Sequence, residues 1–145
     1  MLYFEDMEKG RRLSLGSKTV TRGEIVRFAR EFDPQGFHLE EAGSPYGGII
    51  ASGWHTCAIV QRLAVDGFVR DIASQGSPGI DSIRWLKPVR PDDRLDVSVE
   101  ITDAIPSRSR SDRGTIKVRY TVTNQRGETV VVIEGAGLIG CRPAS

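Results

Sequence analysis

The stretch Gly47–Val69, with the sequence GGIIASGWHTCAIVQRLAVDGFV, decides how the rest of the chain must be arranged. On a helix, the residues from Trp54 to Val69 are apolar nearly all round, and only Gln61, Arg62 and Asp66 form a narrow polar strip. A helix of this kind belongs inside a protein, so other elements must enclose it. At about 1.5 Å per residue it would span roughly 24 Å, which is too short to cross a bilayer.

Five further segments carry strand signals, and in chain order they are Arg12–Val20, Ile80–Val89, Leu95–Thr102, Ile116–Thr123 and Val130–Ile139. The third and fourth alternate apolar and polar residues with the period of two that is typical of a strand with one buried face. Such strands in consecutive order predict a largely antiparallel sheet. We therefore expect an α+β fold of the hotdog type, in which a curved antiparallel sheet wraps one long central helix. Because a regular edge strand invites pairing, we also expect a homodimer or a dimer-based higher oligomer.

Size and charge narrow the class of protein. A length of 145 residues predicts a single domain over residues 1–145, and 20 basic against 19 acidic residues leave a net charge of +1. A charge so near zero gives no global attraction to nucleic acid or acidic lipid, and we interpret the Arg-Ser run at Ser107–Arg113 as a solvated loop.

The cysteines and the lack of long apolar runs suggest a compartment. Cys57 and Cys141 have no metal-binding or redox spacing, so we expect free thiols in a reducing environment and no metal site. No apolar run has the length of a signal peptide or a membrane span. We therefore expect a cytoplasmic protein whose partners include neither a membrane nor a nucleic acid.

A second, shorter helix is predicted from its boundary signals. Thr21 followed by Glu24 fits a capping box, in which each side chain bonds the backbone N–H of the other residue. Apolar residues at helical spacing follow, and Pro34 ends the helix because it disfavours the helical conformation at Asp33. Asp33 is thereby placed at a helix end, at the start of a loop that runs to His38.

Asp33 and His38 are the candidates for proton transfer. Histidine titrates near neutral pH, and a carboxylate held close to it on one short segment gives two proton-transfer groups that face a shared site. This segment leads to the small residues before the central helix, where Ser52 and Gly53 leave first-turn amides with little side-chain cover. Such amides can hold a developing oxyanion on a carbonyl oxygen. Acid, base and oxyanion donor would therefore converge at the start of the helix.

Four separated motifs resemble those of the MaoC-like dehydratase family, which includes the (R)-specific enoyl-CoA hydratases. They are Tyr3-Phe4-Glu5-Asp6, Phe32-Asp33-Pro34-Gln35-Gly36-Phe37-His38, Gly48-Ile49-Ile50-Ala51-Ser52-Gly53-Trp54-His55 and Arg84-Trp85-Leu86-Lys87-Pro88-Val89-Arg90-Pro91. The resemblance covers nearly the whole chain in the same order, and it implies a hotdog fold.

The resemblance also implies a reaction, because in that family an Asp and a His with this spacing catalyse reversible addition of water to a 2-enoyl thioester. Carried over, it makes Asp33 the base that acts on water and His38 the residue that orients the water and exchanges the proton at the α-carbon. The amide of Gly53 would polarise the thioester carbonyl. The remaining residues of the implied oxyanion and substrate-binding set are Ser52, Trp54 and His55.

The implied substrate is an acyl-CoA, with coenzyme A as the carrier, and neither a metal nor a redox cofactor is implied because the thioester supplies the acidity. The chain departs from the family pattern at two places. At Gln35-Gly36-Phe37 the family commonly has Asn-Pro and a bulky aliphatic residue, and at Val60-Gln61-Arg62 it often has a serine.

Other interpretations of single residues stay open. His55 is either a wall of the pocket or, more commonly for a buried helix, a hydrogen-bonded core residue. Arg84, Lys87 and Arg90 either meet the phosphates of coenzyme A or are ordinary surface charges. Asp66 raises the alternative of a hotdog acyl-CoA thioesterase, in which a helix carboxylate activates water. The third hypothesis is a hotdog subunit that binds an acyl thioester without turning it over.

Overall fold

The computed structural model describes residues 1–144, and Ser145, the last residue of the predicted domain, lies outside the described residues. Its main element is a five-stranded sheet in the order β1-β3-β4-β5-β2, in which every neighbouring pair is antiparallel. The strands are β1 (Arg12–Thr19), β2 (Ile80–Trp85), β3 (Arg94–Pro106), β4 (Arg113–Thr123) and β5 (Thr129–Gly140). All five predicted strands are present.

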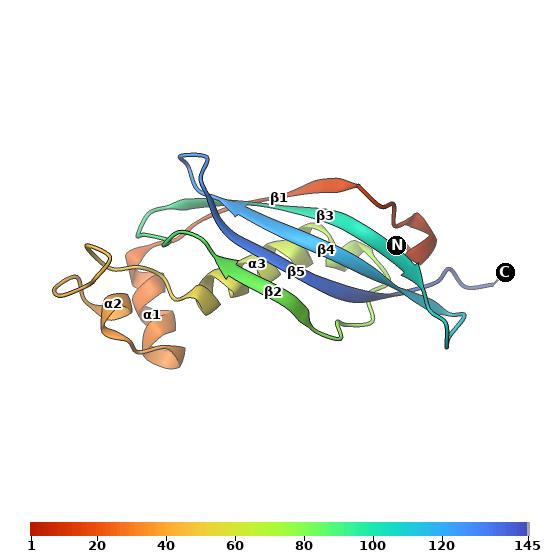
Figure 1. Cartoon of the computed structure of the whole chain (residues 1–145), viewed down its shortest axis with the longest axis horizontal. Helices are drawn as coiled ribbons and strands as arrows, with labels where there is room; N and C mark the ends of the chain where they lie inside the picture. The colour runs from red at the N-terminus through yellow and green to blue at the C-terminus, as the bar shows by residue number, and fades with distance from the viewer. Residues whose placement is uncertain (145) are drawn as a thin grey trace.

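The central helix α3 (Gly53–Gly67) lies against one face of the sheet (Figure 1). Its buried residues Val60 and Ala64 belong to the same hydrophobic core as the inward-facing residues of the strands. In β3, every second residue faces this core, and Leu95 and Val97 have 0% and 2% of their surface exposed. This is the hotdog arrangement that the sequence predicts, with the sheet as wrapping and the helix as filling. No helix among residues 1–144 is long and apolar enough to cross a membrane.

The enclosure of α3 is less complete than its composition predicts. Trp54 keeps 59% of its surface exposed, and Ala58 is also exposed, so the side of the helix away from the sheet faces outward in the single chain. The helix ends at Gly67, two residues before the predicted end, because Phe68 leaves the helical conformation and Val69–Asp71 forms a short 3₁₀ turn. A nearly continuous apolar sequence therefore does not require a helix covered on all sides.

The shorter helix α1 (Arg22–Phe32) has the predicted boundaries. Thr21 accepts a hydrogen bond from the Glu24 amide at 3.2 Å, and Glu24 accepts one from the Thr21 amide at 3.1 Å, which completes the capping box. At the other end, the Asp33 amide donates to the Ala29 carbonyl at 2.8 Å. Since Pro34 follows, the chain turns away at this point and Asp33 stands at the helix terminus.

The segment from Asp33 to His38 is not the continuous loop that the sequence predicts. Residues Gly36–Leu39 form a one-turn helix, α2, and His38 lies on it. The glycine at its start had favoured a flexible turn, but a single helical turn is too short to leave a periodic apolar pattern. Figure 1 shows α1 and α2 together at one end of the sheet, beside the start of α3.

Candidate active site

Asp33 receives hydrogen bonds on both carboxylate oxygens. Ser52 Oγ donates to Oδ2 at 2.7 Å, and Gln35 Nε2 donates to Oδ1 at 2.6 Å. Partial burial opposes the charge on Asp33, but the hydrogen bonds from Gln35 and Ser52, together with His38 nearby, outweigh it and lower the pKa of the carboxyl group. Asp33 is therefore an ionised carboxylate at neutral pH, with 17% of its side chain still exposed.

His38 is oriented by a backbone carbonyl. Its Nδ1 lies 2.7 Å from the Ile50 oxygen, and its Nε2 lies 3.2 Å from Asp33 Oδ2. A carbonyl oxygen only accepts, so Nδ1 carries a proton and Nε2 is the nitrogen that gains or loses one. With only 4% of the residue exposed, the ring has little freedom to turn. The geometry provides a carboxylate and an imidazole nitrogen that can exchange a proton.

Backbone bonds hold α2 beside the approach to α3. The Ile50 amide donates to the Phe37 carbonyl at 3.0 Å, next to the contact between the Ile50 oxygen and His38. The Ala51 amide donates to the Val89 carbonyl at 2.8 Å, which ties the same stretch to the segment after β2. Three parts of the chain that are distant in sequence are therefore fixed at one point.

The first turn of α3 begins one residue after Ser52. Ser52 Oγ accepts from the Trp54 amide at 3.3 Å while it donates to Asp33, so one buried hydroxyl caps the helix and orients the carboxylate. The Gly53 amide has no acceptor among residues 1–144. It lies at the positive end of the helix dipole, where a negatively charged oxygen is stabilised.

Gly53 cannot carry a side chain in this structure. A Cβ added there would lie 2.5 Å from Trp85 Nε1, because the indole covers the start of α3. Beside it is a cavity of about 230 Å³ whose walls include Gly53, Thr56, Trp85 and Val89. Asp33 and His38 are not among these walls, but Ile50, whose carbonyl contacts His38, is one of them. A wider depression, of about 640 Å³, is lined by residues of α1 alone and contains no part of this site.

The other predicted site residues have different surroundings. Ser52 has no exposed surface, so it contacts Asp33 and not an external ligand. Trp54 is exposed and meets Trp85 edge to face, with ring centroids 5.4 Å apart. His55 is buried and stacks on Phe28 of α1, with ring centroids 4.8 Å apart. The structure therefore brings together Asp33, His38, Ser52 and Gly53 and leaves His55 outside.

Sequence reasoning missed three contributors: the amide of Gln35, the carbonyl of Ile50 and the indole of Trp85. Trp85 stands in one of the four motifs, but its place over Gly53 depends on the pairing of β2 with β5, which a motif does not reveal. Within residues 1–144, no cluster of three or more His, Cys, Asp or Glu side chains has the arrangement of a metal site.

A five-stranded sheet around one helix defines a hotdog protein, and the contact between a carboxylate and a histidine beside the N-terminus of that helix is its candidate site. Residues 6–126 match the family model of the MaoC-like domain, and the chain belongs to that family.

Individual relatives agree with this assignment. The uncharacterised protein YdeM of Bacillus subtilis is 39% identical over 123 residues, which cover 82% of this chain and 84% of that protein. The 3-hydroxybutyryl-CoA dehydratase of Methylorubrum extorquens is 32% identical over 148 residues, which cover 96% of this chain and 83% of that protein. A MaoC-like dehydratase from Rhodospirillum rubrum has a crystal structure that matches with a TM-score of 0.88 at 37% identity, over 99% of this chain and 100% of that one.

The burial of His55 predicts a pH dependence of stability. Burial lowers the pKa of His55 below its usual 6.5 and outweighs the opposing charge of Glu24, and Nδ1 has no hydrogen-bond partner among residues 1–144. As the pH falls below 6.5, the unfolded chain binds a proton that folded His55 resists, so the free energy of unfolding decreases, by at most about 1.4 kcal/mol per pH unit. His55→Phe keeps the stacking on Phe28 and removes the titration.

Urea unfolding at pH 7.5 and at pH 5.5 measures this effect. Wild type is expected to lose more stability than His55→Phe between the two values. An equal loss in both proteins would show that His55 takes up its proton as easily when folded as when unfolded.

Proposed function

We propose that this protein is a hydro-lyase that reversibly hydrates a 2-enoyl-CoA, or in the reverse direction dehydrates a 3-hydroxyacyl-CoA. The observation that carries the proposal is the contact between Asp33 Oδ2 and His38 Nε2 at 3.2 Å, close to the start of α3, where the Gly53 amide has no acceptor among residues 1–144. The 3-hydroxybutyryl-CoA dehydratase that shares 32% of its residues with this chain supports the same substrate class.

In the hydration direction, a water molecule lies against the Asp33 carboxylate and His38. Asp33 takes a proton from the water as its oxygen bonds to C3 of the enoyl group, and the π electrons move through C2 onto the thioester oxygen. The Gly53 amide and the helix dipole stabilise that charge. Protonated His38 then gives its proton to C2, and the proton on Asp33 passes to His38 across their contact, which restores both groups.

The hydrogen bonds around Asp33 fit this role. A base must be ionised at the working pH, and the bonds from Ser52 and Gln35 lower the pKa of Asp33. The Ile50 carbonyl fixes the His38 proton on Nδ1, so Nε2 is the nitrogen that meets the reacting atoms.

The thioesterase alternative finds no support in the surroundings of Asp66. Its two carboxylate oxygens are held by Arg62 at 2.8 Å and Arg70 at 2.7 Å on an exposed part of α3. Both ion pairs lower the pKa of Asp66 and hold its carboxylate at the exposed surface of the helix. The residue also lies more than three turns from Gly53 along the helix.

The free edge of β2 supports the proposed homodimer. This edge strand and its surroundings expose Ile80, Trp85 and Leu86, with 54%, 46% and 53% of their surfaces uncovered, together with Trp54 of α3. An exposed apolar edge of this kind is stabilised by pairing with a second copy. Since β2 runs from Ile80 to Trp85, antiparallel pairing of two copies would bring the Ile80 end of one chain toward the Gly53 end of the other.

A second cavity, which we call the glycine hollow, would hold the acyl chain. It has a volume of about 160 Å³, and its apolar walls include Phe68, Ile80, Ile116, Gly135 and Gly137. Gly135 and Gly137 lie on the face of β5 that looks toward α3. Ile80 fills the space beside Gly135, where an added Cβ would lie 2.9 Å from its side chain, so the room that a missing side chain leaves is at Gly137. Its contact with Ile80 puts it at the end of β2 that pairing brings near the partner's site.

The central experiment follows the loss of enoyl absorbance when the purified protein meets crotonyl-CoA and longer 2-enoyl-CoAs. Asp33→Asn and His38→Gln are expected to lower the rate by about a hundredfold or more, because each removes a positioned proton-transfer group. Asp66→Asn, a matched carboxylate change on the same chain, is expected to keep the wild-type rate.

Circular dichroism and thermal unfolding confirm that each variant is folded. If the protein instead releases free thiol, and Asp66→Asn abolishes that release, the protein is a thioesterase and not a hydratase. Wild-type rates in folded Asp33→Asn and His38→Gln would exclude the proposed mechanism.

The glycine hollow gives a prediction about chain length. Gly137→Leu is expected to lower kcat/KM for 2-octenoyl-CoA at least about tenfold relative to crotonyl-CoA, because misfit of a few methylene groups in an apolar pocket costs about 1–3 kcal/mol. Gly137→Ala is the control, since its Cβ would meet Ile116 and Ile139 at ordinary contact distances of 3.6 and 3.9 Å. If Gly137→Leu lowers kcat/KM equally for 2-octenoyl-CoA and crotonyl-CoA, the glycine hollow does not bind the acyl chain.

A further inference from the structure

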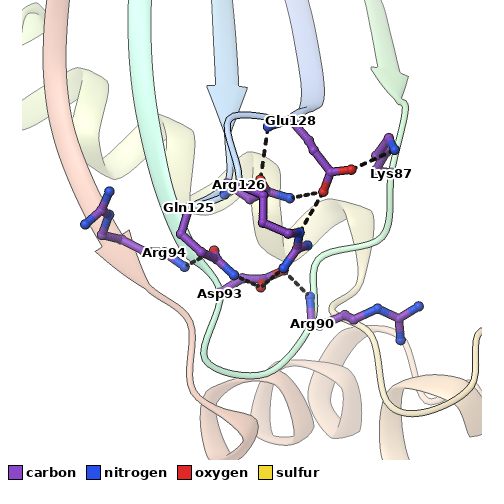
Figure 2. A network of polar contacts seen from close by, with 8 residues as sticks. Lys87, Arg90, Asp93, Arg94, Gln125, Arg126 and Glu128 are labelled. Atoms are coloured by element: carbon purple, nitrogen blue, oxygen red, sulfur yellow. Dashed lines mark hydrogen bonds and ion pairs between the residues drawn. The ribbon is translucent and has the colours of Figure 1, made fainter.

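A cluster of polar side chains holds the turn between β2 and β3 in one conformation (Figure 2). Asp93 is 97% buried, and its carboxylate accepts from the Arg90 amide at 2.9 Å and from Gln125 Nε2 at 2.7 Å. Asp92, which lies between Arg90 and Asp93 in the sequence, has the left-handed φ of 69° that a tight turn requires. The backbone of Arg90 is therefore fixed.

The second carboxylate of the cluster is also engaged. Glu128 accepts from Lys87 Nζ at 2.8 Å, from Arg126 Nε at 2.8 Å and from Asn124 Nδ2 at 2.9 Å. Together these hydrogen bonds lower the pKa of Glu128 to about 2, and the bond from Lys87 has the largest effect. Lys87 and Arg126 are thus both paired with Glu128, and Arg126 Nη1 also lies 3.8 Å from Asp93 Oδ1.

The guanidinium group of Arg90 takes no part in this cluster. Figure 2 shows it directed away from Asp93, and it forms no ion pair with any of residues 1–144. Its Nη1 lies 4.0 Å from the position that a Cβ on Gly48 would occupy, so it faces the glycine-containing approach to α3. Arg90 is half-buried, and a half-buried guanidinium without a counter-charge is a favourable partner for an anion.

The position of Arg90 links it to the proposed site. Val89, the preceding residue, accepts a hydrogen bond from the Ala51 amide at 2.8 Å, and Ala51 stands two residues before Gly53. Arg90 also lines a cavity of about 200 Å³ with Lys87, Pro88, Arg126 and Glu128. Lys87 and Pro88 are shared with the cavity at Gly53, so the two spaces adjoin.

We propose that Arg90 binds a phosphate group of coenzyme A, and that this cationic side chain makes the free nucleotide thioester the substrate of the site. The inference rests on the proposed function. A planar guanidinium binds two phosphate oxygens at once through parallel N–H donors. If the thioester carbonyl binds the Gly53 amide, the pantetheine arm of coenzyme A lies in the cavity at Gly53, and its phosphate groups lie in the adjoining cavity that Arg90 lines.

The alternative carrier, an acyl carrier protein, fits this surface less well. An acidic protein surface is bound by several cations spread over an exposed face. Here a single unpaired guanidinium stands in a small cavity, which is not a face of this kind. A cavity with one such cation fits a phosphate group of coenzyme A better than it fits the surface of a carrier protein.

The test compares one 2-enoyl group on two carriers, coenzyme A and pantetheine, which lacks the phosphates. In Arg90→Gln, the ratio of kcat/KM on the coenzyme A thioester to that on the pantetheine thioester is expected to fall about tenfold, as loss of one charge-assisted hydrogen bond implies. The change should lie in KM and shrink at high salt. Arg108→Gln is the control, because Arg108 is exposed, lies at the far end of the sheet and has no ion-pair partner among residues 1–144.

If the ratio of the two kcat/KM values is unchanged in Arg90→Gln, the proposal is wrong. If the ratio falls equally in Arg108→Gln, the proposal is also wrong, because the effect then follows from the net charge and not from the position of Arg90. A loss confined to a carrier-protein thioester would also overturn it. If the wild-type protein hydrates no 2-enoyl thioester, the proposed function is wrong, but the phosphate contact of Arg90 can still be tested. Calorimetric titration of wild type, Arg90→Gln and Arg108→Gln with coenzyme A then measures the Kd of each protein. A tenfold weaker Kd in Arg90→Gln alone then supports the phosphate contact, and equal Kd values for the three proteins contradict it.

Discussion

The hydroxyl of Ser52 is the contact on which the site depends. It caps α3 through the Trp54 amide and donates to Asp33 at the end of α1, so two helices meet at one fully buried oxygen. The Ile50 bonds to Phe37 and His38 close the same junction from the side of α2. Because the start of α3 is anchored on the sheet, any movement of the Asp33 and His38 pair away from Gly53 has to break buried hydrogen bonds, each of which is costly to leave unpaired.

The fold was largely predictable because its elements leave periodic signals. The alternation in β3 and β4 and the capping box of α1 reappear in the structure. The strand boundaries are less accurate, because β3 continues to Pro106, β4 begins at Arg113 and β2 ends at Trp85 and not at the predicted Val89. Failures occurred where a local pattern is too short or where composition alone was used. The single turn of α2 has no period, and the apolar face of α3 that carries Trp54 is left open by the sheet.

The site was predictable in its residue types but not in its connections. A carboxylate at a helix end and a histidine five residues later suggested the pair, and Asp33 and His38 do lie in contact. Ser52 was taken for a group that meets the ligand, whereas it is buried behind Asp33. The roles of Ile50 and Trp85 depend on contacts between distant segments, and a sequence motif records such residues without saying what they touch.

The most direct measurement of the proposed chemistry is a crystal structure of the Asp33→Asn variant with a 3-hydroxyacyl-CoA bound. The account predicts that the thioester oxygen accepts a hydrogen bond from the Gly53 amide, and that the 3-hydroxyl lies between residue 33 and His38 Nε2. A ligand whose carbonyl is held elsewhere, with its 3-hydroxyl out of reach of His38, would contradict the assignment of this junction as the site of hydration.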